Sequence, residues 1–142
     1  MSPSFRTDLL KHPVIETVLP FVAYENLEVK AKALSIIRLL VKSCTEKTGL
    51  DLIYSEAALG DLEAITSGTC DHPTLVGEST RLICYLPIAA RSENNVKKLS
   101  KFKFIEVIVN QLKSDHFIMV NEALLALNVL FTINFGNLKH FK

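Results

Sequence analysis

Residues 14–40 read VIETVLPFVAYENLEVKAKALSIIRLL, and a related pattern returns 90 positions later. Residues 104–130 read FIEVIVNQLKSDHFIMVNEALLALNVL, and the two stretches align without a gap. The alignment pairs Ala33 with Ala123, Leu34 with Leu124 and Leu40 with Leu130. Self-similarity at a fixed offset indicates a repeat architecture, so the repeat has to be defined before any single element.

A third copy of the pattern lies between these two. Residues 59–86 read LGDLEAITSGTCDHPTLVGESTRLICYL, which places Ser79 at the position of Ala33 and Ala123, with separations of 46 and 44 residues. Helical repeats of about 40 to 47 residues are typical of armadillo and HEAT solenoids. We therefore expect an all-α fold, a right-handed armadillo/HEAT-type solenoid with about three repeats of 44–46 residues. It would form one domain, 1–142, with repeat copies at about 1–45, 46–91 and 92–135 and a tail at 136–142.

Helix signals in the sequence agree with this repeat. Pro13 and Pro73 suit first helical positions, where a missing N–H is harmless. Ser114 and Asp115 are candidate N-caps, and Gly68 is a candidate stop. Pro20 and Pro87 should kink or end their helices. The predicted helices are 14–23, 28–44, 47–54, 56–67, 73–91, 94–100, 102–113 and 116–134.

The composition predicts a compact protein of the cytoplasm. The chain has 142 residues, of which 49% are hydrophobic and 22% are charged. A chain of this length can bury a hydrophobic core that needs no disulfides or metal ions for stability. The unbroken apolar run 123–127 is far shorter than a spanning helix, and residues 1–10 do not resemble a signal peptide, so we expect no membrane insertion. Cys44, Cys70 and Cys84 are odd in number and form no C-x-x-C pair, which favours reduced thiols.

The net charge of +1 argues against nucleic acid as a partner. One local exception is a basic segment, 91–103, in which Lys97, Lys98 and Lys101 alternate with Phe102 and, just beyond it, Phe104. Two interpretations stay open: a phosphate-binding patch with stacking aromatic rings, or a solvated helix face around a buried apolar edge. We favour the solvated face.

Enzymatic and metal-binding patterns are weak. Cys70, Asp71 and His72 place a thiol, an acid and an imidazole together, but adjacency in sequence is not catalytic geometry. His116 and His140 lack a second ligand at helical spacing, and no phosphate-binding glycine loop is present. We expect no enzyme activity, no cofactor and no metal site.

The longest helix of each armadillo repeat lines the concave groove. Aligned on that pattern, the groove residues are Lys32, Ser35 and Leu39, then Glu78, Arg81 and Tyr85, then Glu122, Leu125 and Val129. A ladder of asparagines that reads extended peptides is absent, because Leu39, Tyr85 and Val129 occupy its places. Such a mixed apolar and charged surface suits a folded protein partner. Glu122 has a second interpretation, in which it only complements the helix dipole.

Two stretches resemble a particular family. VGESTRL at 76–82 resembles the GES-x-R-L segment of the small G-protein GDP-dissociation stimulators (SmgGDS). SDHFIMVNEALLAL at 114–127 is similar to their S-E-H-x-I-M-x-N-E-A-L-x-A-L run. The resemblance extends from about residue 28 to about residue 133 and corresponds to the C-terminal part of that family.

This resemblance implies an armadillo protein that binds small GTPases of the Rho and Rap type, which carry polybasic, prenylated tails. It implies a chaperone that stimulates guanine-nucleotide exchange; the alternative is an armadillo scaffold without effect on nucleotides. Glu78, Arg81, Asn121 and Glu122 coincide with the family pattern, and Tyr85 and Leu125 complete the candidate partner-binding set. Because solenoids need polar terminal repeats, we also expect the isolated chain to self-associate or to be marginally stable.

Overall fold

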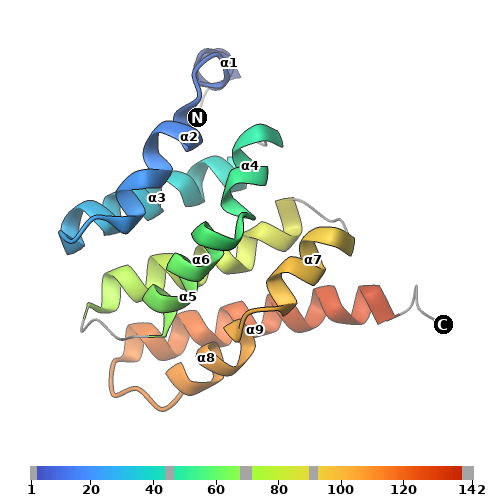
Figure 1. Cartoon of the computed structure of the whole chain (residues 1–142). Helices are drawn as coiled ribbons and strands as arrows, with labels where there is room; N and C mark the ends of the chain where they lie inside the picture. The colour runs from blue at the N-terminus through green and yellow to red at the C-terminus, as the bar shows by residue number, and fades with distance from the viewer. Residues whose placement is uncertain (1–2, 44–46, 68–71, 90–92, 139–142) are drawn as a thin grey trace.

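The computed structural model describes residues 3–43, 47–67, 72–89 and 93–138, and over these ranges the chain is entirely helical (Figure 1). The long helices of the three repeat copies are α3 (Leu27–Ser43), α6 (Pro73–Ala89) and α9 (Phe117–Leu138). The shorter elements are α1 (Pro3–Leu10), α2 (Val14–Val18), the 3₁₀ helix η1 (Leu19–Ala23), α4 (Lys47–Ile53), α5 (Glu56–Thr66), α7 (Glu93–Ser100) and α8 (Phe104–Gln111).

The three long helices form a stack with a common direction. Figure 1 shows α6 between α3 and α9, with the shorter helices α4, α5, α7 and α8 on the near side. Ala33, Ser79 and Ala123, which the sequence repeat makes equivalent, are all buried, because small side chains let neighbouring helices approach. The fold is therefore the predicted all-α solenoid of the armadillo type.

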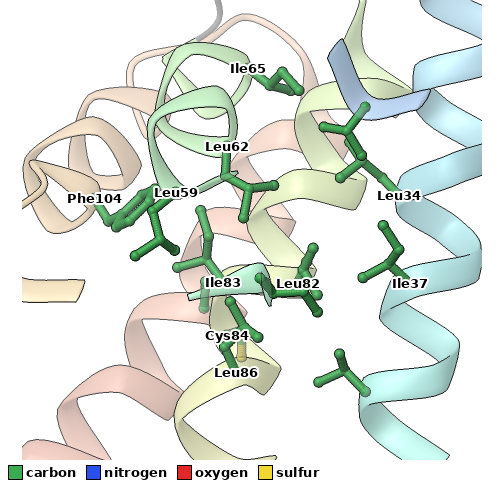
Figure 2. Close-up of a cluster of buried hydrophobic side chains, with 14 of the residues drawn as sticks. Leu34, Ile37, Leu59, Leu62, Ile65, Leu82, Ile83, Cys84, Leu86 and Phe104 are labelled. Carbon is green, nitrogen blue, oxygen red and sulfur yellow. The ribbon is translucent and has the colours of Figure 1, made fainter. Parts of the chain in front are cut away.

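Apolar side chains from successive copies meet between the long helices. Leu34 and Ile37 of α3 face Leu82 of α6, and Leu59, Leu62 and Ile65 of α5 cover the same cluster (Figure 2). Phe104 of α8 reaches the cluster from the third copy (Figure 2). Full burial of a leucine or isoleucine contributes about 1.5–3 kcal/mol, so these contacts join the copies into one core.

A buried polar network crosses the second and third copies. The Thr66 and Ser79 hydroxyls lie 2.5 Å apart, which joins α5 to α6. The Gln111 amide nitrogen donates to the Thr66 carbonyl at 2.8 Å and to the Thr80 hydroxyl at 3.2 Å. These four side chains are almost fully buried, and each has a hydrogen-bond partner, as buried polar groups require. Sequence periodicity gave no sign of Gln111, because one polar residue near a helix end is normally exposed.

The prolines act partly as predicted. At Leu19 the α-helix changes to the 3₁₀ helix that contains Pro20, so the predicted interruption of helix 14–23 is confirmed. Pro87 lies inside α6, two residues before its last residue Ala89. Its missing N–H removes one hydrogen bond of the helix, and its side chain is buried. The helix α1 was not predicted.

Side chains accept hydrogen bonds from backbone N–H groups at the beginning of two helices. The Ser55 hydroxyl accepts from the Ala58 backbone N–H at 3.2 Å and caps α5. The His72 ring nitrogen Nδ1 accepts from the Leu75 N–H at 3.2 Å, at the beginning of α6. The prediction of Ser114 or Asp115 as the N-cap of the last long helix is wrong, because α9 begins at Phe117 and its first hydrogen bond runs from the Val120 N–H to the His116 carbonyl; the Ser114 hydroxyl instead accepts from the His116 N–H at 3.0 Å in the turn before the helix. The predicted stop at Gly68 lies outside the described residues.

Within the described ranges, none of the helices combines the length and the apolar character that are needed to cross a membrane.

Candidate protein-binding surface

Arg81 and Glu122 form an ion pair that joins α6 to α9. Arg81 Nε donates to Glu122 Oε2 at 2.8 Å, and Nη2 donates to Oε1 at 2.5 Å. The Glu122 side chain is 7% exposed, whereas the Arg81 side chain is 42% exposed. The hydrogen bond that Arg81 donates to the Glu122 carboxylate raises the pKa of Arg81 above its usual value. The guanidinium group therefore neutralises a buried carboxylate and keeps one edge towards solvent.

Arg38 and Glu78 form the corresponding pair between α3 and α6. Arg38 Nε donates to Glu78 Oε2 at 2.6 Å, and Nη2 lies 3.4 Å from Oε1. Both side chains are 14% exposed. Glu78 and Arg81 are three residues apart and therefore lie on one face of α6. Glu78 pairs with the preceding long helix, α3, and Arg81 pairs with the following one, α9.

These two pairs, here called the Arg–Glu ladder (Arg38–Glu78 and Arg81–Glu122), explain much of the predicted charged stripe. Sequence alignment had placed Glu78, Arg81 and Glu122 on one groove face, all projecting towards a partner. The structure brings them close together, but each glutamate is bound by an arginine of the preceding copy. Two-donor arginine–carboxylate geometry is strong and directional, so the ladder fixes the stacking of the copies.

Arg38 was missed as a site residue. Its partner lies 40 residues away and the partner of Arg81 lies 41 residues away, nearly one repeat in each case. A search for opposite charges separated by slightly less than the repeat length would have found both pairs. Local spacing could not, because the pairing depends on how the long helices are aligned.

The remaining predicted residues leave a more accessible surface. Asn121 is exposed and Leu125 is 54% exposed on α9. Tyr85 is half-buried on α6, and the Lys42 ammonium lies 5.5 Å from the centre of its ring. Leu39 on α3 is 46% exposed. Apolar side chains thus stand beside the solvent edge of Arg81, a combination found at protein–protein contacts. Their role in binding stays a prediction.

The basic segment does not form a stacking platform over its described part. Phe104 is buried in the core, and the rings of Phe102 and Phe104 pack on each other with centroids 5.7 Å apart. Lys97 and Lys101 are exposed on and just after α7. Lysines around a packed aromatic edge match the favoured interpretation of a solvated face.

Candidate chemical groups are few among the residues described. No three His, Cys, Asp or Glu side chains of that set gather closely enough to hold a metal ion. Cys70 and Asp71 of the weak catalytic pattern lie outside the described residues, and His72 serves as a helix cap. Cys84 is a free, buried thiol, and burial raises its pKa to about 11, with a further contribution from Glu122.

An apolar pocket opens between α6, α7 and α8. Its volume is about 260 Å³, slightly below the usual range of small-molecule sites. Apolar side chains make up most of its wall: Ile83, Pro87, Leu99, Phe102, Phe104, Ile105 and Leu130.

Comparison with solved structures supports the fold alone. A crystal structure of an engineered protein superposes with a TM-score of 0.66 and 15% identity, covering 83% of this chain and 45% of the other. Another engineered protein gives a TM-score of 0.66 with 17% identity, over 83% of this chain and 27% of the other. Identities this low leave function open.

Sequence comparison finds distant relatives of the chain. No protein-family model matches the chain. Rap1 GTPase-GDP dissociation stimulator 1-A of Xenopus laevis is 28% identical over 138 residues, which cover 95% of this chain and 22% of that protein. Stimulator 1-B of the same species is 30% identical over 128 residues, covering 88% and 20%. The chain spans about one fifth of the length of these relatives, and over that span it is a distant homologue of the Rap1 GTPase-GDP dissociation stimulators.

Proposed function

We propose that the chain binds small GTPases of the Rho or Rap type, stimulates the release of their GDP and acts as their chaperone. The observation that carries this proposal is the similarity to two Rap1 GTPase-GDP dissociation stimulators over 138 and 128 residues. Since the chain covers 22% and 20% of those proteins, the activity of the whole relatives is proposed here only for the segment that aligns.

Exchange by such a protein needs no covalent chemistry. A protein that binds the opened, nucleotide-free GTPase more tightly than the loaded form weakens nucleotide binding by the same factor, because the two equilibria are linked. A rigid surface suits this task, since it can favour one conformation of its partner. The Arg–Glu ladder and the packed long helices would supply that rigidity.

The proposed contact surface is the solvent side of the ladder. The exposed edge of Arg81 can pair with a carboxylate of the GTPase, while Asn121, Tyr85 and Leu125 offer polar and apolar contacts beside it. Glu78 and Glu122 contribute in another way, by holding Arg38 and Arg81 in place. Arginine and tyrosine are the residue types that most often dominate binding energy at interfaces.

The test is the rate at which a fluorescent GDP analogue leaves a Rap-type or Rho-type GTPase. We expect the chain to accelerate release at micromolar concentration, and we expect Tyr85→Ala and Leu125→Glu to weaken the effect. Lys97→Glu with Lys98→Glu is the control, because these lysines lie on the short helix α7, away from the Arg–Glu ladder. If the control abolishes release while the ladder-side variants do not, the assigned surface is wrong.

A scaffold without effect on nucleotides is the second candidate. It is favoured by the exposed apolar positions Leu39 and Leu125, which fit many kinds of folded partner. Binding of a GTPase with an unchanged rate of GDP release would support the scaffold. The absence of any GTPase binding would overturn the first proposal.

The polybasic, prenylated tail of the GTPase is a further part of the proposal. The 260 Å³ pocket between α6, α7 and α8 has the apolar wall that the end of an isoprenoid chain requires. We expect a farnesylated peptide to bind the chain, and Ile105→Glu at the pocket to reduce that binding. Equal binding of farnesylated and unmodified peptides would remove this part of the proposal.

A further inference from the structure

One face of α9 is uncovered along most of its length. Its members occur every three or four residues and therefore lie on one side of the helix. Phe117 is 83% exposed, Leu124 is 55% exposed and Phe131 is 52% exposed. Asn121 and Asn128 lie between them and are exposed as well. We call this face the end stripe: Phe117, Asn121, Leu124, Asn128 and Phe131.

The equivalents of Asn121, Leu124 and Phe131 are covered in the first two copies, whereas Leu27, the equivalent of Phe117 in the first copy, is 37% exposed. Leu34 and Thr80 are equivalent to Leu124 by the repeat, and both have no exposed surface. Val41 is equivalent to Phe131 and is 2% exposed. Gly77 is equivalent to Asn121, and a Cβ placed on it would lie 3.7 Å from Glu122 Cγ of the next long helix. The end stripe is thus the face that contacts another long helix elsewhere in this fold.

The end stripe is symmetric about Leu124 at its two ends: Phe117 and Phe131 each lie seven residues from Leu124, whereas Asn121 lies three residues before it and Asn128 four residues after it. From Phe117 to Phe131 it reads Phe, Asn, Leu, Asn, Phe, with intervals of four, three, four and three residues. When the helix is turned end over end about Leu124, each residue falls near one of its own kind. Phe117 then meets Phe131, Asn121 comes within one residue of Asn128, and Leu124 meets its own copy. A surface that complements itself under a two-fold rotation is what a symmetric dimer requires.

Among the described side chains of the helix, no charge faces the end stripe. The charged residue in the sequence of α9 is Glu122, and its side chain points away from the end stripe into the ion pair with Arg81. Ile118 and Leu125, 59% and 54% exposed, extend the apolar surface beside the stripe. Asparagine amides from the two helices can hydrogen-bond to each other, because each amide carries both donors and acceptors. Antiparallel helices also place opposite dipole ends together.

We propose that the chain forms a two-fold symmetric dimer in which α9 packs antiparallel on α9 of a second copy through the end stripe. The contact runs over 14 residue steps, about 21 Å at the helical rise. Leu124 lies on the two-fold axis, with a phenylalanine pair on each side. This arrangement covers the apolar face that the other two copies cover with the next long helix.

The first experiment measures mass against concentration for the 142-residue chain by light scattering and sedimentation. We expect a mass that rises to twice the 15.8 kDa of the chain. Leu124→Glu should raise the dissociation constant of the dimer about tenfold or more, because it places two carboxylates face to face. Leu39→Glu is the matched control, since Leu39 has similar exposure on α3 and lies outside the stripe. Circular dichroism checks that both variants stay helical.

The second experiment tests the orientation. Phe117→Cys and Phe131→Cys are made in separate chains with Cys44 and Cys70 replaced by serine, and a short bismaleimide is added to each chain and to their mixture. Antiparallel packing predicts cross-linking in the mixture and little in either chain alone. Cross-linking of each chain with itself would show a parallel pair and overturn the stated geometry.

A monomer at every concentration, or equal behaviour of Leu124→Glu and Leu39→Glu, would overturn the dimer itself. The GTPase proposal rests on sequence similarity and has a separate assay. Because Asn121 belongs to both surfaces, that assay is also run on Leu124→Glu, in which the dimer contact is broken, so that failure of one proposal can be told from failure of the other.

Discussion

Arg81 lies between two carboxylates, those of Glu78 and Glu122. It binds Glu122 on α9, and Glu78, three residues earlier on the same helix, raises the pKa of Arg81 slightly further. Glu78 is itself held by Arg38. The four groups thus form a row of alternating charge across three helices. Sequence reasoning could place Glu78, Arg81 and Glu122 on one stripe, but not pair them, because pairing depends on contacts between copies about 40 residues apart.

Removal of Arg81 should destabilise the fold through Glu122. In Arg81→Met the carboxylate stays buried without its partner, and breaking a buried pair costs about 3–5 kcal/mol. Because Arg81 is partly exposed, we expect about 2–3 kcal/mol from urea unfolding. The double variant Arg81→Met, Glu122→Gln should recover part of this loss, since a neutral amide is easier to bury. If the single and double variants were equally stable, the unpaired Glu122 carboxylate would not be the source of the loss.

Charge reversal at Glu78 and Glu122 should therefore affect folding as well as binding. The sequence alone suggested exposed positions, where reversal changes stability by less than about 0.5 kcal/mol. In the structure a lysine at either position would face an arginine inside the stack. Binding tests are better made at Tyr85 and Leu125, which keep the ladder intact.

Cys84 should make the fold less stable in alkaline solution. Burial raises the pKa of its thiol from 9.0 to about 11, so between these values the unfolded chain has lost a proton that the folded chain keeps. The contribution of this thiol to the free energy of unfolding is therefore fully present below pH 9 and is lost as the pH rises to 11, a loss on the order of 3 kcal/mol for a shift of two pKa units. Burial shifts the pKa of Tyr54 in the same direction.

The measurement compares urea unfolding of the wild type and of Cys84→Ala at pH 8 and pH 10.5. The variant should lose less stability than the wild type between the two pH values. It lacks the Cys84 thiol, so of the two groups with a raised pKa only Tyr54 still contributes. An identical loss in both proteins would mean that the Cys84 thiol ionises as easily in the folded chain as in the unfolded one.

At the scale of the element, most helices follow from their own sequence. The predicted helix 28–44 corresponds to α3 (Leu27–Ser43), 56–67 to α5 (Glu56–Thr66) and 116–134 to α9 (Phe117–Leu138). Repeated apolar spacing and capping residues are local signals, so they can be read from one sequence. The tolerance of α6 for Pro87 could not be read in this way, because burial against neighbouring helices offsets the lost hydrogen bond.

Two glycines in short helices should respond in opposite ways to alanine. A Cβ on Gly49 of α4 would lie 2.8 Å from Ile15 Cβ of α2, while a Cβ on Gly60 of α5 meets nothing within 4 Å. Alanine is favoured over glycine inside a helix by about 1 kcal/mol, whereas overpacking costs about 1–3 kcal/mol. Gly60→Ala should therefore raise the melting temperature and Gly49→Ala should lower it. A gain in both variants would show that α2 and α4 are packed loosely.

At the scale of the whole molecule, stability should be greatest in the middle of the stack. In a solenoid each copy contacts only its neighbours, so a central copy gains from two interfaces and a terminal copy from one. The sequence repeat predicted this architecture, because it records the spacing of equivalent positions. It could not show that the third copy has an open face, since Leu34, Thr80 and Leu124 differ in exposure through their neighbours alone.

Hydrogen exchange can measure this distribution of stability. Helix α6 packs on both α3 and α9, and most of its residues from Leu75 onwards are buried, so its amides should open only with global unfolding. In the monomeric variant Leu124→Glu, α9 should exchange faster than α6, because its end stripe has no cover. In the wild-type chain at high concentration, protection of α9 should rise while that of α1 and α2 stays low. Slower exchange in α9 than in α6 of the variant would contradict the nearest-neighbour account, because one interface would then stabilise a helix more than two do.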